Sequence, residues 1–163
     1  MEPKSLKYLK WGFVFLFFHI TFVVDLLPDF VGALLLYASI QSHKRLTEAE
    51  ERIKIFFLVL AADYFLHWII PFDFILESLL VTVISTYAMY VLLGEVGGRV
   101  REFQPEKTSQ LNVVRVLMVI SQVTVFVVSP YENQELNALL ALVSVGILIG
   151  LLVVVCGIRT EEE

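Results

Sequence analysis

The chain contains a single cysteine, Cys156, so it cannot form an intramolecular disulfide. This cysteine lies in an apolar segment, where the residue usually packs as a small hydrophobic side chain. The sequence also lacks the signatures of P-loop proteins, serine proteases, rhomboids and lipid phosphatases, and it has no H-E-x-x-H zinc motif. Because no motif supplies a nucleophile or a metal site, we assign no catalytic residue, and a non-enzymatic protein is favoured.

Charged residues are also scarce. They make up 18% of the chain, whereas 58% of it is hydrophobic and the mean hydropathy is +0.79. Soluble domains are usually about 45–50% apolar. A chain of 163 residues cannot bury so many apolar side chains in one aqueous core, so a lipid bilayer must cover most of them. The net charge of −5 argues against a nucleic-acid partner.

We therefore predict an all-α membrane protein, a single domain over residues 1–163 with six transmembrane helices. The predicted spans are 11–27, 28–41, 53–70, 72–93, 111–129 and 136–158. The connections after the first, third and fifth spans contain no Lys or Arg, and all 12 such residues lie toward the opposite ends of the spans. By the positive-inside rule, this distribution predicts a multi-pass protein of the cell membrane with both termini in the cytoplasm.

The six spans are expected to pair as three helical hairpins, 8–43, 53–95 and 111–158. The second span offers only about 22 Å of helix against about 30 Å of hydrocarbon. We expect the first hairpin to be short, with a recessed tip beside a cavity that opens to the outside. Local thinning of the bilayer is the alternative.

Two local patterns predict where helices begin and where the chain turns. Thr47 followed by Glu50 is a capping-box pattern, which indicates a helix start ahead of the third span. Three glycines within 94–98, followed by Pro105, indicate that the longest loop follows the fourth span. Mixed charges over 95–110 are typical of a solvated loop or of a docking surface for a cytoplasmic partner.

Several ionisable side chains fall within or beside the outer halves of the spans. They form a candidate polar pocket: His19, Asp25, Asp29, Asp63, His67, Asp73 and Glu77. An acidic group is costly in hydrocarbon, so these residues should face the interior of the bundle and pair with one another. Asp63 and His67 lie four residues apart, which places them on one face of a helix.

Three interpretations of this pocket stay open. It is a proton relay, a metal site built from His19, Asp63, His67 and Glu77, or a hydrogen-bonded pair that holds helices together. The metal is unknown. Convergence of these side chains in the folded chain would favour the first two interpretations.

The sixth span contains Gly146 and Gly150 in a G-x-x-x-G pattern, which lets two helices approach closely. The pattern predicts packing within the bundle or, alternatively, dimerisation.

The segment Asp25-Leu-Leu-Pro-Asp-Phe-Val-Gly32 resembles a turn found in a group of small bacterial polytopic membrane proteins. These proteins carry L-P-D-F-[IV]-G after their first span. The resemblance covers roughly residues 10–45 and implies a bacterial cytoplasmic membrane and a recurring hairpin, with no activity attached. Six spans with both termini inside also resemble the substrate-binding subunits of energy-coupling-factor vitamin transporters. Those subunits have small residues on their first span, whereas 11–19 is bulky here.

Three functions fit these features. The first is a non-enzymatic accessory or sensor subunit that binds a small molecule, a lipid or a protein partner through an outward-facing acidic pocket. The second is a small proton-coupled transporter, or a transporter's substrate-binding subunit, that uses Asp63, His67 and Glu77. The third is an intramembrane enzyme with a metal or acid/base site. The sequence identifies no cofactor.

Overall fold

The computed structural model describes residues 2–17, 29–70, 75–128 and 134–159, and these fold entirely into helices and short connections. The prediction of an all-α chain is confirmed. The described residues form six helices: α1 (Pro3–Phe17), α2 (Asp29–Gln41), α3 (Glu48–Ile69), α4 (Ile75–Val100), α5 (Pro105–Val128) and α6 (Gln134–Cys156).

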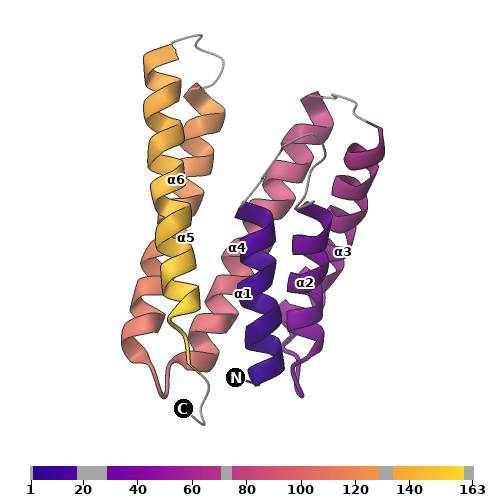
Figure 1. Cartoon of the computed structure of the whole chain (residues 1–163), viewed down its shortest axis with the longest axis vertical. Coiled ribbons are helices and arrows are strands. Elements are labelled where there is room, and N and C mark those ends of the chain that lie inside the picture. The colour runs from indigo at the N-terminus through magenta and orange to yellow at the C-terminus, as the bar shows by residue number, and fades with distance from the viewer. Residues whose placement is uncertain (1, 18–28, 71–74, 129–133, 160–163) are drawn as a thin grey trace.

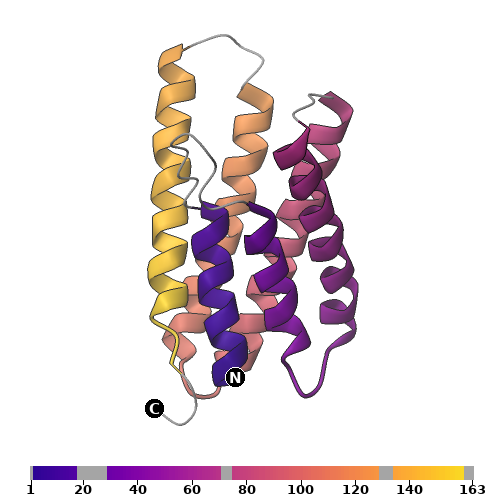
Figure 2. The ribbon, with the colours of Figure 1, turned by 45° about the vertical axis from the view of Figure 1, so that its right-hand side comes forward.

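The helices form a closed ring. Each one contacts its neighbours in the sequence, and α6 returns to contact α1 (Figures 1 and 2). The Lys10 ammonium group reinforces this closure by donating to the Ile158 carbonyl oxygen at 2.9 Å. A cation at this place also satisfies a carbonyl left open just beyond the C-terminal end of α6.

The basic residues gather at one end of the ring. The start of α1, the connection from α2 to α3 and the connection from α4 to α5 all lie at the lower end in Figure 1, as does the end of α6. Every Lys and Arg lies in or beside these segments, and Arg115 in α5 is the deepest of them. We call this end of the bundle the basic end.

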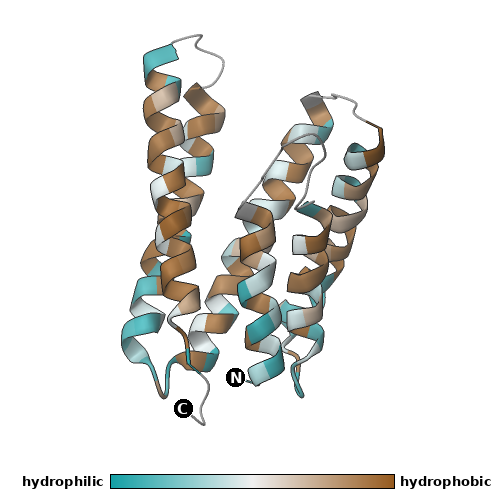
Figure 3. Cartoon of the chain, viewed as in Figure 1, coloured by the Kyte–Doolittle hydropathy of each residue, from teal (hydrophilic) through white to brown (hydrophobic). Residues whose placement is uncertain are grey.

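Three helices are long and apolar enough to cross a bilayer: residues Leu76–Val100, Pro105–Val128 and Gln134–Cys156. The ribbons of these helices are largely brown in Figure 3, which marks hydrophobic residues, and many of their large apolar side chains are exposed. Leu76 and Leu142, for example, are 82% and 71% exposed. Such surfaces suit contact with lipid, and the chain has the features of a membrane protein.

A close helix crossing joins α1 and α2. A Cβ added at Gly32 would lie 2.9 Å from the backbone nitrogen of Leu16 and 3.0 Å from the carbonyl oxygen of Gly12. A Cβ at Gly12 would similarly lie 2.6 Å from Leu36 Cδ2. The two backbones therefore approach so closely that only glycine fits between them.

The glycines predicted to pack helices are placed differently. A Cβ added at Gly146 or Gly150 would meet nothing within 4 Å among the described parts of the chain. The described residues make no close contact at these two glycines, and packing within the bundle and dimerisation both stay predictions. A contact that does join α5 and α6 is a hydrogen bond of 2.7 Å between the hydroxyl groups of Ser121 and Ser144.

The predicted helix start at Thr47 is confirmed, whereas the predicted loop after the fourth span is not. The Thr47 hydroxyl accepts a hydrogen bond from the Glu50 backbone, and the Glu50 carboxylate accepts one from the Thr47 backbone, so the capping box is confirmed. The predicted long loop over 95–110 is wrong, because α4 continues to Val100 and Pro105 already begins α5. A glycine costs a helix only about 1 kcal/mol relative to alanine. Burial of neighbours such as Val96 outweighs that cost.

The described parts of the first two helices are short. The structure describes α1 with 15 residues and α2 with 13, and in Figures 1 and 2 their described parts end well below the upper ends of α4 and α6. The α1 helix also begins at Pro3, eight residues ahead of the predicted span. The predicted recessed tip lies outside the described residues.

Substituting Gly32 with alanine should destabilise the chain by about 1–3 kcal/mol, because the added methyl group would meet the α1 backbone. The matched control is Gly146→Ala, where the methyl group meets nothing within 4 Å. There, better helix propensity should leave stability unchanged or raised by up to about 1 kcal/mol. Thermal unfolding of both variants in detergent checks this, and equal melting temperatures would contradict the crossing.

Candidate cation-binding site

The structure brings together three of the seven residues predicted to form a polar pocket. Asp63 and His67 lie on α3, and Glu77 lies in the first turn of α4. Asp29, a fourth member, begins α2 and lines a separate cavity. The remaining members, His19, Asp25 and Asp73, lie outside the described residues.

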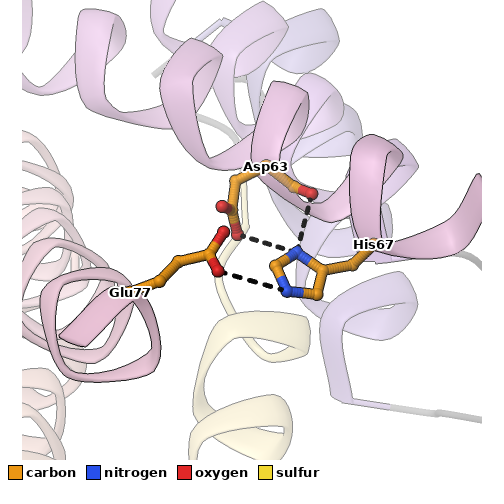
Figure 4. A group of neighbouring side chains, drawn as sticks. All are labelled: Asp63, His67 and Glu77. Atoms are coloured by element: carbon orange, nitrogen blue, oxygen red, sulfur yellow. Dashed lines mark hydrogen bonds and ion pairs between the residues drawn. The ribbon is translucent and has the colours of Figure 1, made fainter. Parts of the chain in front are cut away.

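The Asp63–His67–Glu77 cluster places an imidazole between two carboxylates (Figure 4). His67 Nδ1 lies 3.6 Å from Asp63 Oδ2, and His67 Nε2 lies 3.8 Å from Glu77 Oε2. His67 Nδ1 also lies 3.1 Å from the backbone carbonyl oxygen of Asp63. Each ring nitrogen thus faces an oxygen acceptor, which is the arrangement that stabilises a protonated imidazole.

Local and long-range features both contribute to this geometry. The spacing of four residues puts Asp63 and His67 one turn apart on the same face of α3. Glu77 reaches them because α3 and α4 are neighbours in the ring and α4 starts where α3 ends. All three side chains are partly exposed, so an ion can reach them from outside the bundle.

The same three groups are also suited to a divalent metal ion. Each offers one ligand atom, and these atoms all lie within 4.8 Å of one another. An imidazole with two carboxylates is a ligand set that Zn²⁺ accepts, with water completing the coordination. When Nδ1–H donates to the Asp63 carbonyl oxygen, Nε2 is left as the metal-binding nitrogen, a pairing typical of metal-binding histidines.

A second polar feature is a cavity of about 180 Å³ inside the ring, to which all six helices contribute side chains. Its polar lining includes Asp29, Tyr64, Ser85 and Gln122. At about 30 Å³ per water molecule, this volume holds a few waters or an ion with its hydration shell. It is smaller than the roughly 300 Å³ at which pockets for drug-sized ligands begin.

Tyr64 links the cavity to the cluster. It lines the cavity and follows Asp63 directly on α3, and the carboxylates of Asp29 and Asp63 both act electrostatically on its hydroxyl group. The two polar features therefore belong to one region of the bundle, away from the basic end.

A third polar feature, which the sequence analysis missed, is a buried network at the basic end. Its centre is Glu50, whose side chain is fully buried. The Arg99 guanidinium group donates to both carboxylate oxygens, with Nε at 2.9 Å from Oε1. His43 Nδ1 makes an ion-pair contact with the same oxygen at 2.8 Å. The network thus joins the end of α2, the start of α3 and the end of α4.

The network extends to α1 through two buried serines. His43 Nε2 lies 2.7 Å from Ser5 Oγ. The Ser5 hydroxyl donates to the Ser39 carbonyl oxygen, and the Ser39 hydroxyl donates to the Ser5 carbonyl oxygen, each at 2.9 Å. With both hydroxyl protons used in this way, His43 donates from Nε2 to Ser5 Oγ, and its Nδ1 faces the Glu50 carboxylate.

The order Ser5, His43, Glu50 resembles the nucleophile, base and acid of a hydrolase. In such an enzyme the serine donates to the histidine and is open to substrate. Here the serine donates to a backbone carbonyl, and its side chain is fully buried. The arrangement therefore fastens helices together.

Burial disfavours the ionised form of Glu50, but its partners stabilise that form by more. Burial raises the pKa of this carboxyl, but hydrogen bonds from His43, Arg99 and the Thr47 backbone, together with the positive charge of Arg99, lower it to about 2. Sequence signals for this network were partial. The capping box marked Glu50, whereas the basic character of Arg99 indicated only topology.

No family model matches the chain, and no curated protein or solved structure matches it either. Its function is therefore inferred from the geometry described above.

Replacing Glu50 with glutamine should destabilise the fold by about 3–5 kcal/mol at neutral pH, because His43 and Arg99 lose the carboxylate that compensates them. The pKa of Glu50 is lowered from 4.5 to about 2 in the folded chain, so its stabilisation is complete above pH 4.5 and is lost as the pH falls toward 2. The gap in melting temperature between wild type and Glu50→Gln should therefore narrow as the pH falls from 7 to 3.

Glu48→Gln is the matched control for this experiment. Its side chain lies in the same helical turn, is 92% exposed and makes only a loose pair with Arg52 at 3.7 Å. Such a pair contributes at most about 1 kcal/mol. Equal losses in Glu48→Gln and Glu50→Gln would contradict the proposed role of the network.

Proposed function

We propose that the chain is a six-span protein of the bacterial cytoplasmic membrane, with both termini in the cytoplasm and a short first hairpin whose tip is recessed. The collection of every Lys and Arg at one end of the ring supports this orientation. The brevity of α2, at 13 residues, supports the recessed hairpin.

In this membrane the protein acts as a non-enzymatic binding or sensor subunit that takes up a cation on its outer side. The observation that carries this function is the convergence of Asp63, His67 and Glu77 from two helices. Ionisable groups placed together inside a membrane protein commonly mark an ion or proton site. The bound cation is a divalent metal ion, and protons compete for the same three groups.

A second function, proton-coupled transport, is favoured by the internal cavity. A polar cavity lined by all six helices lies next to the cluster, and Asp29 provides a carboxylate within it. A carrier uses such a cavity as a station along its path, whereas a binding subunit uses it only to hold water or a ligand.

The proposed orientation predicts which residues face the outside of the cell. In a Cys156→Ser background, a cysteine at Gln134 should react with a membrane-impermeant maleimide in intact cells, because the start of α6 lies at the end opposite the basic residues. A cysteine at Gln104, in the connection between α4 and α5, should react only after permeabilisation. Labelling of Gln104→Cys in intact cells would contradict the proposed orientation and indicate the reverse one.

The cation site predicts that purified wild-type protein binds one Zn²⁺ ion, measured by isothermal titration calorimetry in detergent. Glu77→Gln should weaken this binding about tenfold or more, since it removes one charged ligand. Binding should also weaken between pH 7.5 and pH 5.5, because protons then occupy the ligands.

Glu135→Gln is the matched control, since Glu135 is also an acid in the first turn of a helix at the same end of the bundle. It should bind Zn²⁺ as the wild type does. Wild-type protein that takes up neither Zn²⁺ nor Mn²⁺ would refute the metal site. Pumping of protons or Zn²⁺ into proteoliposomes, abolished by Asp63→Asn, would favour the transporter instead.

A further inference from the structure

A long groove runs between α4 and α5 on the outer surface of the ring. It encloses about 580 Å³ and is lined mainly by apolar side chains, with Thr82, Thr86 and Gln122 as polar members. Leu79 and Phe126 line it far from the basic end, and Tyr90 and Val116 line it nearer to that end. Both walls belong to helices long and apolar enough to cross a bilayer, so the groove runs along the bilayer normal.

The groove opens toward lipid. Val83 on α4 and Ile120 on α5 line it, and these side chains are 61% and 55% exposed. In a membrane, hydrocarbon chains cover exposed apolar side chains of this kind. An extended acyl chain has the shape and polarity of this groove.

An arginine lies beside the groove at its basic end. The Arg115 guanidinium carbon lies 4.7 Å from the centroid of the Tyr90 ring. Its Nη1 atom fills the space that a Cβ at Gly94 would take, so the group lies directly against α4. The nearby Glu95 carboxylate accepts a hydrogen bond from Thr47 instead.

Arg115 lacks an anionic partner within the part of the chain that the structure describes. Its Nε atom is buried and has no hydrogen-bond acceptor among those residues, and no carboxylate there pairs with its guanidinium group. An arginine inside a membrane segment is costly unless its charge is compensated. The guanidinium fork is suited to a phosphate group, to which it donates two parallel hydrogen bonds.

The depth of Arg115 fits a lipid headgroup. The α5 helix has 24 residues, or about 36 Å of helix, which exceeds the hydrocarbon thickness of about 30 Å. Arg115 is the eleventh residue of α5, about 15 Å from its start, so it lies roughly 9 Å inside the hydrocarbon boundary when the excess length is at the basic end, and its long side chain extends toward the interface. The other basic residues at this end attract anionic headgroups to the same surface.

We propose that the α4–α5 groove binds one acyl chain of an anionic phospholipid from the leaflet at the basic end, with the lipid phosphate on Arg115. Two independent features select this occupant: an apolar groove open to the bilayer and an uncompensated guanidinium group at the end of that groove. A basic pocket between two helices at this depth is a recognised place for acidic lipids.

The test compares phosphatidylglycerol with phosphatidylcholine of the same acyl chains, added to the full-length protein in detergent, and counts bound lipid by native mass spectrometry. Wild-type protein should retain phosphatidylglycerol with about tenfold preference, because the choline cation of phosphatidylcholine offsets the charge of its phosphate and is repelled by Arg115 and the other basic residues at this end. Arg115→Gln should lose this preference. The matched control Arg101→Gln removes a charge from the connection at the same end, and it should keep the preference.

Two further variants separate the groove from the charge and keep the result clear if Arg115→Gln does not fold. Gly94→Ala displaces the guanidinium group without altering net charge, and Ile120→Trp fills the groove while leaving Arg115 intact. Both should reduce retention of phosphatidylglycerol. Equal retention of the two lipids by the wild type, or equal losses in Arg101→Gln and Arg115→Gln, would overturn the proposal. Stabilisation by inorganic phosphate equal to that by phosphatidylglycerol would also overturn it, because the site would then bind a soluble anion.

Discussion

The basic end of this bundle depends on burying one carboxylate. Glu50 is fully enclosed, and a buried charge is tolerated only when partners compensate it. Arg99 comes from α4, His43 follows α2, and the backbone of Thr47 precedes α3, so satisfying this one group brings three chain segments together. Through His43 and Ser5 the same requirement reaches α1. Most of the fully buried apolar side chains lie around this network, toward the basic end.

The two polar clusters of the described chain differ in the way that their partners are spaced. Contacts around Glu50 are 2.5–2.9 Å long, and no water reaches its side chain. Contacts around His67 with Asp63 and Glu77 are 3.6 and 3.8 Å long, and the three side chains are partly exposed. The first cluster is closed and holds helices together. The second is open and leaves room for a proton or a metal ion between its members, which is why the proposed function belongs there.

The outer surfaces of α4, α5 and α6 are suited to contact with lipid. Their exposed faces are apolar, so the polar groups they carry must find partners within the bundle or from the bilayer itself. Ser121 and Ser144 find each other between α5 and α6. Among the described residues, Arg115 lies against Gly94 and the face of Tyr90 and pairs with no carboxylate, and the lipid proposed for the α4–α5 groove supplies an anion.

Sequence alone determined those features that depend on neighbours along the chain. Composition indicated an all-helical membrane protein, the Thr47–Glu50 spacing predicted a capping box, and the spacing of Asp63 and His67 placed them on one helix face. Contacts between helices were decided only by the tertiary structure, because they depend on how each helix is rotated and where two helices cross. Glu77 joins His67 in this way, and Gly12 and Gly32 rather than Gly146 and Gly150 form the close crossing. Packing also explains why α4 stays helical at its glycines. Burial of the neighbouring side chains outweighs the weak local preference of glycine for a turn.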